Sequence, residues 1–270
     1  MLAATPAVAV DQVWTGAVDS NFSTGGNWIS GTAPGSTDNA LYDVGGGGTS
    51  ANSDVNASIN INAISLQGGY AGVVTNQASS TINFATSISV STGGFLNAGT
   101  LTGTGAFNVT GGQVLLGGTS NYTGATTISG PGVVFAGSTT GLSSSSAFAV
   151  GSGATLDLGG FSNTIGSLAD IGGAGGSISN TSVSGAAATL TTGGDNSSTS
   201  YAGTINDGNG ALALVKVGTG TMILANANGY SGGTTISGGT IQVTDAASLG
   251  TGAVTLSPSL ISFASMERAS

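Results

Sequence analysis

Short runs in which apolar and polar residues alternate recur along most of the chain. They are Ile59–Ile61, Thr81–Phe84, Ile88–Val90, Phe107–Val109, Thr155–Leu158, Leu212–Leu214 and Val254–Leu256. Alternation with a period of two is typical of a β-strand with one buried face. Clusters of Gly, Asn and Ser between the runs indicate turns. No longer stretch carries the apolar stripe of an amphipathic helix, so the pattern predicts an all-β chain with almost no α-helix.

An internal repeat organises these runs. Tyr122–Gly130 and Tyr230–Gly238 are identical at seven of nine positions. Each copy follows a Gly-Thr-Gly and an apolar run, and each precedes another apolar run. We therefore place repeats near residues 103–135 and 216–243. Repetition on this scale is typical of a solenoid, in which each unit buries its apolar face against its neighbours.

The low charge content favours stacked parallel strands over a sandwich of hairpins. Only 5% of the residues are charged, and Thr, Ser and Asn occupy the polar positions of the strands. Parallel coils place like residues about 4.8 Å apart, where like charges repel each other while Asn ladders and stacked aromatic rings add stability. The sequence predicts a parallel β-helix over residues 49–256.

Composition excludes several classes of function. The net charge is −9, and Lys216 and Arg268 are the only basic residues, so the chain cannot neutralise the phosphates of a nucleic acid. His and Cys are absent, which excludes a Ser-His-Asp triad and His- or Cys-based metal sites. No apolar run is long enough for a transmembrane segment. We predict no catalytic, metal-binding or cofactor-binding residue, and no cofactor.

Two segments carry a family resemblance. Lys216–Leu224 followed by Gly229–Val243 resembles the autotransporter-associated β-strand repeat, and the copy around Tyr122 resembles a degraded version of it. The N-terminal stretch, with Trp14, Asn27-Trp28 and Asp38-x-Ala-x-Tyr42, is similar to the opening module of many such surface proteins. The resemblance covers about residues 11–256.

What the resemblance implies is a right-handed parallel β-helix exported as an autotransporter passenger. Its expected location is secreted or at the cell surface, on the extracellular side of a bacterial outer membrane. Its expected partners are a host-cell, matrix or glycan surface. The translocator β-barrel of that family is not present in this chain, and we recognise no sorting anchor, which leaves the export route open and suggests a fragment.

The chain divides into four segments on these grounds. Residues 1–10 end in Ala7-Val8-Ala9, the small-x-small form of a signal-peptidase site, and resemble a signal-peptide remnant. An ordinary apolar N-terminus is the alternative. Residues 11–48 form the aromatic, Gly-rich opening module, and residues 49–256 form the β-helix. Residues 257–270 are an atypical tail, expected to be flexible.

Six aromatic residues are candidates for special roles. Four tyrosines begin a Tyr-x-Gly motif, and they are Tyr70, Tyr122, Tyr201 and Tyr230. They could stack on a ligand such as a sugar, although stacking on each other to fix the register of the coils is the interpretation we favour. Trp14 and Trp28 are candidates to cap the open N-terminal end of the helix, with binding of a partner as the alternative.

Together these observations predict a non-catalytic surface passenger, either adhesin-like or a structural stalk. The first alternative is a β-helix that binds or degrades polysaccharides, which would need carboxylates gathered on one face. The ten Asp residues are scattered, and we interpret each, including Asp157 in the middle of a strand, as a turn former or a solvated outer residue. The second alternative is a self-assembling or ice-binding solenoid built on rows of Thr.

Overall fold

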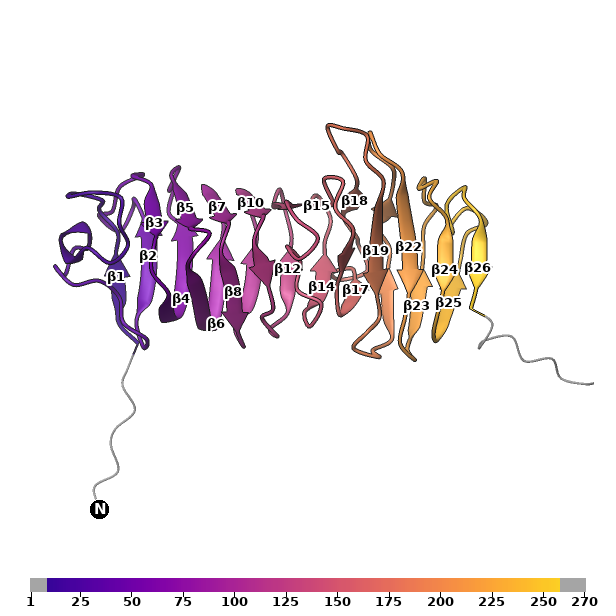
Figure 1. Ribbon diagram of the computed structural model, residues 1–270, viewed down its shortest axis with the longest axis horizontal. Helices are drawn as coiled ribbons and strands as arrows, with labels where there is room; N and C mark the ends of the chain where they lie inside the picture. Colours follow the sequence, from indigo (N-terminus) through magenta and orange to yellow (C-terminus); the bar gives the residue numbers. More distant parts are fainter. Residues whose placement is uncertain (1–8, 258–270) are drawn as a thin grey trace, which may run out of the picture.

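Parallel pairing joins all the strands of the computed structural model, which describes residues 9–257. The strands wind into a solenoid of about ten turns, an elongated body with β1 near one end and β26 at the other (Figure 1). The parallel β-helix predicted from the sequence is therefore confirmed. Its right-handed sense stays a prediction.

Two long sheets run along the N-terminal and central coils. The strands of the first sheet are β1 (Asp11–Val13), β2 (Asn39–Asp43), β4 (Ile59–Gln67), β6 (Thr81–Val90), β8 (Thr100–Gly103), β9 (Ala106–Val109), β11 (Thr119–Ser120), β12 (Thr126–Ile128), β14 (Ala147–Val150) and β17 (Ser167–Ala169). The strands of the second sheet are β3 (Ser53–Val55), β5 (Val73–Asn76), β7 (Gly94–Asn97), β10 (Gln113–Leu116), β13 (Val133–Ala136), β15 (Thr155–Asp157), β18 (Ser177–Ser179) and β21 (Thr204–Ile205).

Two shorter sheets complete the C-terminal coils. One contains β16 (Asn163–Thr164), β19 (Ala188–Thr192), β22 (Leu212–Lys216), β24 (Thr234–Ile236) and β26 (Val254–Leu256). The other contains β20 (Thr199–Tyr201), β23 (Thr221–Leu224) and β25 (Thr240–Val243). A 3-10 turn at Gly25–Asn27 (η1) is the one helical element among residues 9–257, as the near-absence of helical patterning predicts.

Side-chain hydrogen bonds between neighbouring coils reveal the length of a turn. Thr126 Oγ1 lies 2.8 Å from Ser146 Oγ, 20 residues further on. Ser80 Oγ donates to the carbonyl oxygen of Val55, 25 residues earlier, at 2.7 Å. A period of this size is the coil length of a β-helix, in which each turn hydrogen-bonds only to the turns before and after it.

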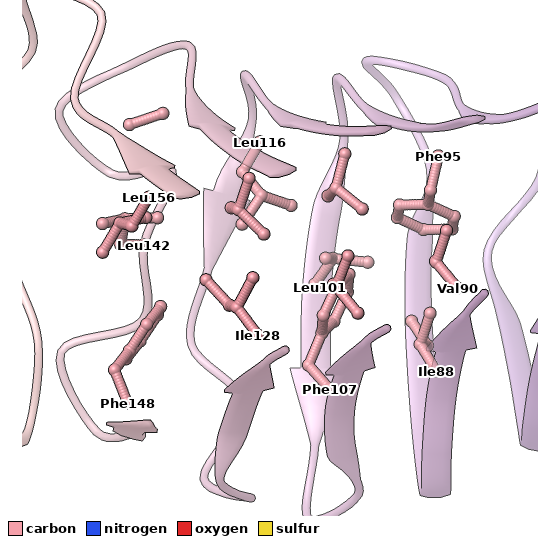
Figure 2. Close-up of a cluster of buried hydrophobic side chains, with 14 of the residues drawn as sticks. Ile88, Val90, Phe95, Leu101, Phe107, Leu116, Ile128, Leu142, Phe148 and Leu156 are labelled. Atoms are coloured by element: carbon pink, nitrogen blue, oxygen red, sulfur yellow. The ribbon is translucent and has the colours of Figure 1, made fainter. Parts of the chain in front are cut away.

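The core is a continuous stack of apolar side chains inside the coils. Ile88 pairs in register with Phe107, and neither is exposed to solvent. Figure 2 shows both with Phe148, each contributed by a different coil. The inward positions predicted from the alternating runs are buried in β6, β9 and β22. In β26, the last strand of its sheet, Val254 and Leu256 remain 49% exposed.

Of the segments predicted from the sequence, the opening module and the β-helix lie within the described residues, and the N-terminal segment and the tail lie almost entirely outside them. The predictions for the N-terminal segment and the tail fall almost wholly on residues 1–8 and 258–270, which lie outside the described residues. The opening module, 11–48, contains β1, η1 and β2. Its β2 pairs with β4, so the module continues the first sheet directly.

Candidate functional site

The four Tyr-x-Gly tyrosines lie inside the solenoid. Tyr70 and Tyr201 are 1% exposed, and Tyr122 and Tyr230 are fully buried. Burial raises the pKa of all four phenols, because the phenolate would lose its hydration. The rings are at most 1% exposed, which does not favour stacking of a ligand on them, and such a role stays a prediction.

Each phenol group is held by a hydrogen bond to a threonine side chain on a strand or to a backbone oxygen. Tyr122 Oη lies 2.7 Å from Thr126 Oγ1, and Tyr230 Oη lies 2.6 Å from Thr234 Oγ1, so the two repeats share one geometry. The other two hydroxyls donate to backbone oxygens, Tyr70 to Ala51 at 2.9 Å and Tyr201 to Gly176 at 3.0 Å. A buried hydroxyl with a partner does not carry the cost of an unpaired polar group.

The tyrosines do not stack on one another, which corrects the second part of that expectation. Tyr70 packs against Tyr42 with ring centroids 5.2 Å apart, and Tyr122 packs against Phe84 and Phe107 at 5.4 and 5.8 Å. Successive motif tyrosines are separated along the chain by more than one coil, so they do not form a continuous ladder. Each one instead fills the interior locally and ties a turn to the strand beside it.

Close approach of neighbouring coils explains why the third residue of the Tyr-x-Gly motif is glycine. A Cβ atom on Gly124 would meet the carbonyl oxygen of Gly105 in the preceding coil, closer than real Cβ contacts allow. The same conflict exists in the other copies, at Gly72, Gly203 and Gly232. The Tyr-x-Gly motif thus marks the points where successive coils pass backbone against backbone, where only glycine fits.

Trp14 and Trp28 form an aromatic cluster in the first coil. Their ring centroids lie 5.0 Å apart in an edge-on arrangement, and Phe22 and Tyr42 pack against the same cluster. Trp28 Nε1 donates to the carbonyl oxygen of Phe22 at 2.8 Å. Both indoles are at most 2% exposed, so they fill the end of the core. Their role as a cap stays a prediction.

Carboxylates are dispersed along the solenoid. Among residues 9–257, no three acidic side chains gather in a way that could hold a metal ion. Most of the Asp side chains accept hydrogen bonds from nearby turns, as Asp207 does from the backbone N–H groups of Leu212 and Ser231 at 2.7 and 3.1 Å. These hydrogen bonds outweigh burial, which acts in the opposite direction, and lower the pKa of Asp207.

Asp157 departs from the expectation of a solvated outer residue. It is 2% exposed and accepts hydrogen bonds from the N–H of Gly159 at 2.8 Å, from the N–H of Thr181 at 3.0 Å and from the hydroxyls of Ser179 and Thr181. It therefore ties two neighbouring coils together. Its outward position in β15 is covered by the loop that follows β18, which sequence alternation alone does not reveal.

Lys216, one of the two basic residues of the sequence, is buried, which the sequence analysis did not predict. Its side chain points inward at the end of β22 and is 1% exposed. Nζ donates to the carbonyl oxygens of Val217 at 2.6 Å and Gly218 at 3.5 Å. Burial lowers the pKa of Lys216, and the charge of Asp195 partly opposes this effect.

Among the openings on the outer surface of residues 9–257 are two grooves that differ in chemistry. The first, which we call the apolar groove, has a volume of about 510 Å³ and runs over β7, β10 and β13. Leu96, Leu115 and Phe135 lie in register along its floor, with Phe161 at its border and Val183 beside it. The signal in the sequence was the loss of alternation in β10 and β13, where consecutive residues are apolar.

The second opening, which we call the hydroxyl groove, lies between β11 and β16 and has a volume of about 330 Å³. Thr and Ser side chains form most of its lining, among them Thr119, Ser120, Thr164 and Thr191. No pattern in the sequence distinguishes these residues from the many other Thr and Ser of the chain, so the sequence analysis missed this groove.

Parallel coils around one apolar interior, with a nearly uncharged exterior, define this protein as a β-solenoid of the kind expected for an exported passenger. Residues 214–243 match the family model of the passenger-associated transport repeat. This segment covers the second predicted repeat and includes β23, β24 and β25. The repeat and the solenoid together support the resemblance to an autotransporter passenger that the sequence motifs indicated.

The other comparisons add no relative. Neither the curated proteins nor the solved structures gave a match. Within residues 9–257, no helix has the length and apolar character needed to cross a membrane.

Proposed function

We propose that this chain is an exported, non-catalytic passenger that acts outside the cell as an adhesin-like or structural surface. The observation that carries the proposal is the passenger-associated transport repeat at 214–243, set in a parallel solenoid. A solenoid offers long faces on which residues recur from coil to coil, which suits binding of an extended partner.

The distribution of ionisable groups supports the non-catalytic part. The sequence contains no His or Cys, and Lys216 is enclosed in the core. General acid–base chemistry requires titratable groups within hydrogen-bond reach of a substrate. In the part of the chain that the structure describes, the carboxylates instead hold turns, as Asp157 and Asp207 do.

The location is tested on intact cells that produce the native protein. Cells are treated with an external protease, and the protein is followed with an antibody raised against the purified chain. We expect the protein to be digested on intact cells, or found in the medium, while a cytoplasmic marker stays whole. A protein that is protected until the cells are lysed would overturn the proposal.

The alternative of a polysaccharide-degrading β-helix gives a different result in a second assay. The purified chain is incubated with plant and bacterial polysaccharides, and new reducing ends and unsaturated products are measured. We expect neither product above a heat-denatured control. Turnover of any of these polysaccharides would replace the surface role with an enzymatic one.

A further inference from the structure

The apolar groove contains a stripe of apolar side chains on the outer surface of the solenoid. Leu96, Leu115 and Phe135 form an outward column, one residue from each of three successive coils. In the same register, Thr75 comes before this column and Asp157 comes after it. Leu115 is 40% exposed to solvent. An exposed apolar strip with polar residues at its rim is typical of a surface that another molecule covers.

The same part of the solenoid is polar on its other long sheet. Ser89, Asn108 and Thr127 lie in register with one another at outward positions of β6, β9 and β12. Asn108 on β9 and Leu115 on β10 belong to one coil, because the two strands follow each other along the chain. The apolar stripe is therefore a property of one face and not of these coils in general.

A projecting loop lies beside the groove. Residues 180–187 join β18 to β19, and the turns beside these strands reach beyond the rest of the body (Figure 1). Val183 in this loop is fully exposed, and it lines the groove together with Phe161, which is 37% exposed. One face thus carries an apolar projection next to an apolar groove. Such a face can be complementary to its own copy, because in a two-fold dimer each projection enters the groove of the other copy.

The middle of the chain, which builds most of the groove, carries no charge. Residues 55–156 contain no Asp, Glu, Lys, Arg or His. The carboxylates lie on either side of this middle section, before Val55 or after Leu156. A net charge of −9 keeps copies of a protein apart in general. Two elongated molecules that cross at their uncharged middles avoid most of this repulsion, because their carboxylates stay away from the contact.

The chemistry of the lining distinguishes between the molecules that the groove could accept. A polysaccharide carries hydroxyl groups, which Leu96, Leu115 and Phe135 cannot pair with, and a polar group that loses its partner costs free energy. A charged peptide finds no opposite charge on residues 55–156. A second copy of the chain brings an uncharged apolar surface of the same kind. It is also the occupant for which this structure supplies both halves of the contact, the projection and the groove.

We propose that the apolar groove is a self-association surface, through which two copies of this chain form a two-fold symmetric dimer. In this dimer, Val183 of each copy packs against Leu115 and its apolar neighbours on the other copy. The groove crosses six successive strands, from β5 to β18, which is about 24 Å at the spacing of parallel strands. A face of this length is smaller than the interfaces of obligate dimers, so the dimer exchanges with the monomer. Self-association of this kind does not depend on export, and it therefore goes beyond the proposed function.

Analytical ultracentrifugation of the purified full chain measures the association. We expect the average mass to rise with concentration from 25.4 kDa toward twice that value and to stop there. Salt should strengthen the dimer, because it screens the like charges of the two copies and leaves the apolar contact in place. A chain that stays monomeric up to about 100 μM in high salt would overturn the inference. Unlimited growth beyond the dimer would also overturn it, because a two-fold contact closes at two copies.

Charged substitutions locate the contact on the molecule. Leu115→Asp places a carboxylate in the stripe, and Asn108→Asp places one on the other sheet of the same coil, so both variants change the net charge equally. We expect Leu115→Asp to weaken the dimer by about tenfold or more and Asn108→Asp to associate as the native chain does. Val183→Asp should also weaken it, and it cannot act through the core because this side chain is fully exposed. Native association in both Leu115→Asp and Val183→Asp would overturn the inference.

The absence of Cys from the sequence allows a direct test of which residues meet. Copies that carry Val183→Cys are mixed with copies that carry Leu115→Cys, and the mixture is oxidised gently. A disulfide between the two variants, identified by the masses of the linked peptides, is the expected result. Asn108→Cys replaces Leu115→Cys in the control mixture and should give little of the corresponding product. Equal yields in the two mixtures would mean that random collisions form the disulfide, and the proposed contact would be wrong.

Discussion

At the scale of single residues, the close approach of neighbouring backbones restricts which residues the fold accepts more than side-chain chemistry does. The glycines of the Tyr-x-Gly motifs lie against carbonyl oxygens of the preceding coil. The tyrosines beside them are buried and hydrogen-bonded. The Tyr-x-Gly motif therefore allows coils to stack closely, and it recurs because the contact between its glycine and the backbone of the preceding coil recurs.

Gly124→Ala should destabilise the protein by about 1–3 kcal/mol, because the new Cβ meets the carbonyl oxygen of Gly105 and the two coils must separate. Gly194→Ala is the matched control, since nothing lies within 4 Å of its Cβ position. It should be neutral or slightly stabilising. Urea unfolding followed by circular dichroism measures both. Equal midpoints for the two variants would contradict the close approach of the coils.

Lys216 leads to a prediction about pH. Because burial lowers its pKa in the folded state, the unfolded chain holds the proton more tightly than the folded one. Its contribution to stability is therefore unfavourable at low pH and improves as pH rises through the lowered pKa toward the ordinary value of about 10.4. Lys216→Met keeps the length of the side chain and removes this titration.

The comparison requires urea unfolding of the native chain and of Lys216→Met at several pH values between 7 and 10. The free energy of unfolding of the native chain should rise relative to that of the variant over this range. Effects of the other ionisable groups are shared by both proteins and cancel in the difference. A difference that stays constant with pH would show that the ammonium group is not penalised by burial.

At the scale of elements, the strands could be predicted from the sequence and the grooves could not. Alternation identifies β6, β9 and β22 because one face of each strand packs into the core, and burial leaves a period of two. The hydroxyl groove depends on a coil that lacks a strand between β11 and β16. The burial of Asp157 depends on a loop from the next coil. Both are set by contacts about one coil apart, which a local pattern does not encode.

The opening module offers an element-scale prediction centred on Asn27. Its Oδ1 accepts hydrogen bonds from the N–H groups of Val18 and Asp19 at 2.9 and 3.0 Å, and its Nδ2 donates to Asp19 Oδ1 and the Asn21 carbonyl at 2.6 and 2.9 Å. Asn27→Ala leaves these partners without a bond inside the protein. We expect local destabilisation of about 1–3 kcal/mol.

Trp14 and Trp28 report on this change directly, since they are the only two tryptophans and both lie in the module. In Asn27→Ala, the shift of tryptophan fluorescence should precede the loss of β-sheet circular dichroism as urea increases. Asn83→Ala, on the exposed face of β6, is the control and should keep the native order of the two transitions. Coincident transitions in Asn27→Ala would show that the network does not hold the module independently.

At the scale of the whole molecule, the scarcity of charge and the stacking of coils are linked. Residues in register lie one above another in every sheet, as Thr126 lies between Phe107 and Phe148. A charged outward column would repeat its repulsion at each coil, whereas Asn pairs such as Asn60 and Asn83 bond across coils at 2.9 Å. With no His in the sequence, few groups titrate near neutral pH.

The pH limits of the fold follow from its buried tyrosines and its hydrogen-bonded aspartates. Burial raises the pKa of the tyrosines, Tyr42 included, so the unfolded chain ionises first as pH passes about 10. Stability from these groups is complete below pH 10 and is lost above it. Hydrogen bonds lower the pKa of Asp19, Asp195 and Asp207, so their contribution is lost as pH falls below about 4.

Tyrosinate absorbance at 295 nm and β-sheet circular dichroism, followed together from pH 9 to 13, measure the alkaline limit. Because all five tyrosines are buried, their ionisation requires the coils to open. The two signals should therefore change in one cooperative step above pH 10. Ionisation of the tyrosines near pH 10 with the β-sheet signal intact would mean that the rings reach solvent in the folded solenoid, and the packing of its interior would have to be revised.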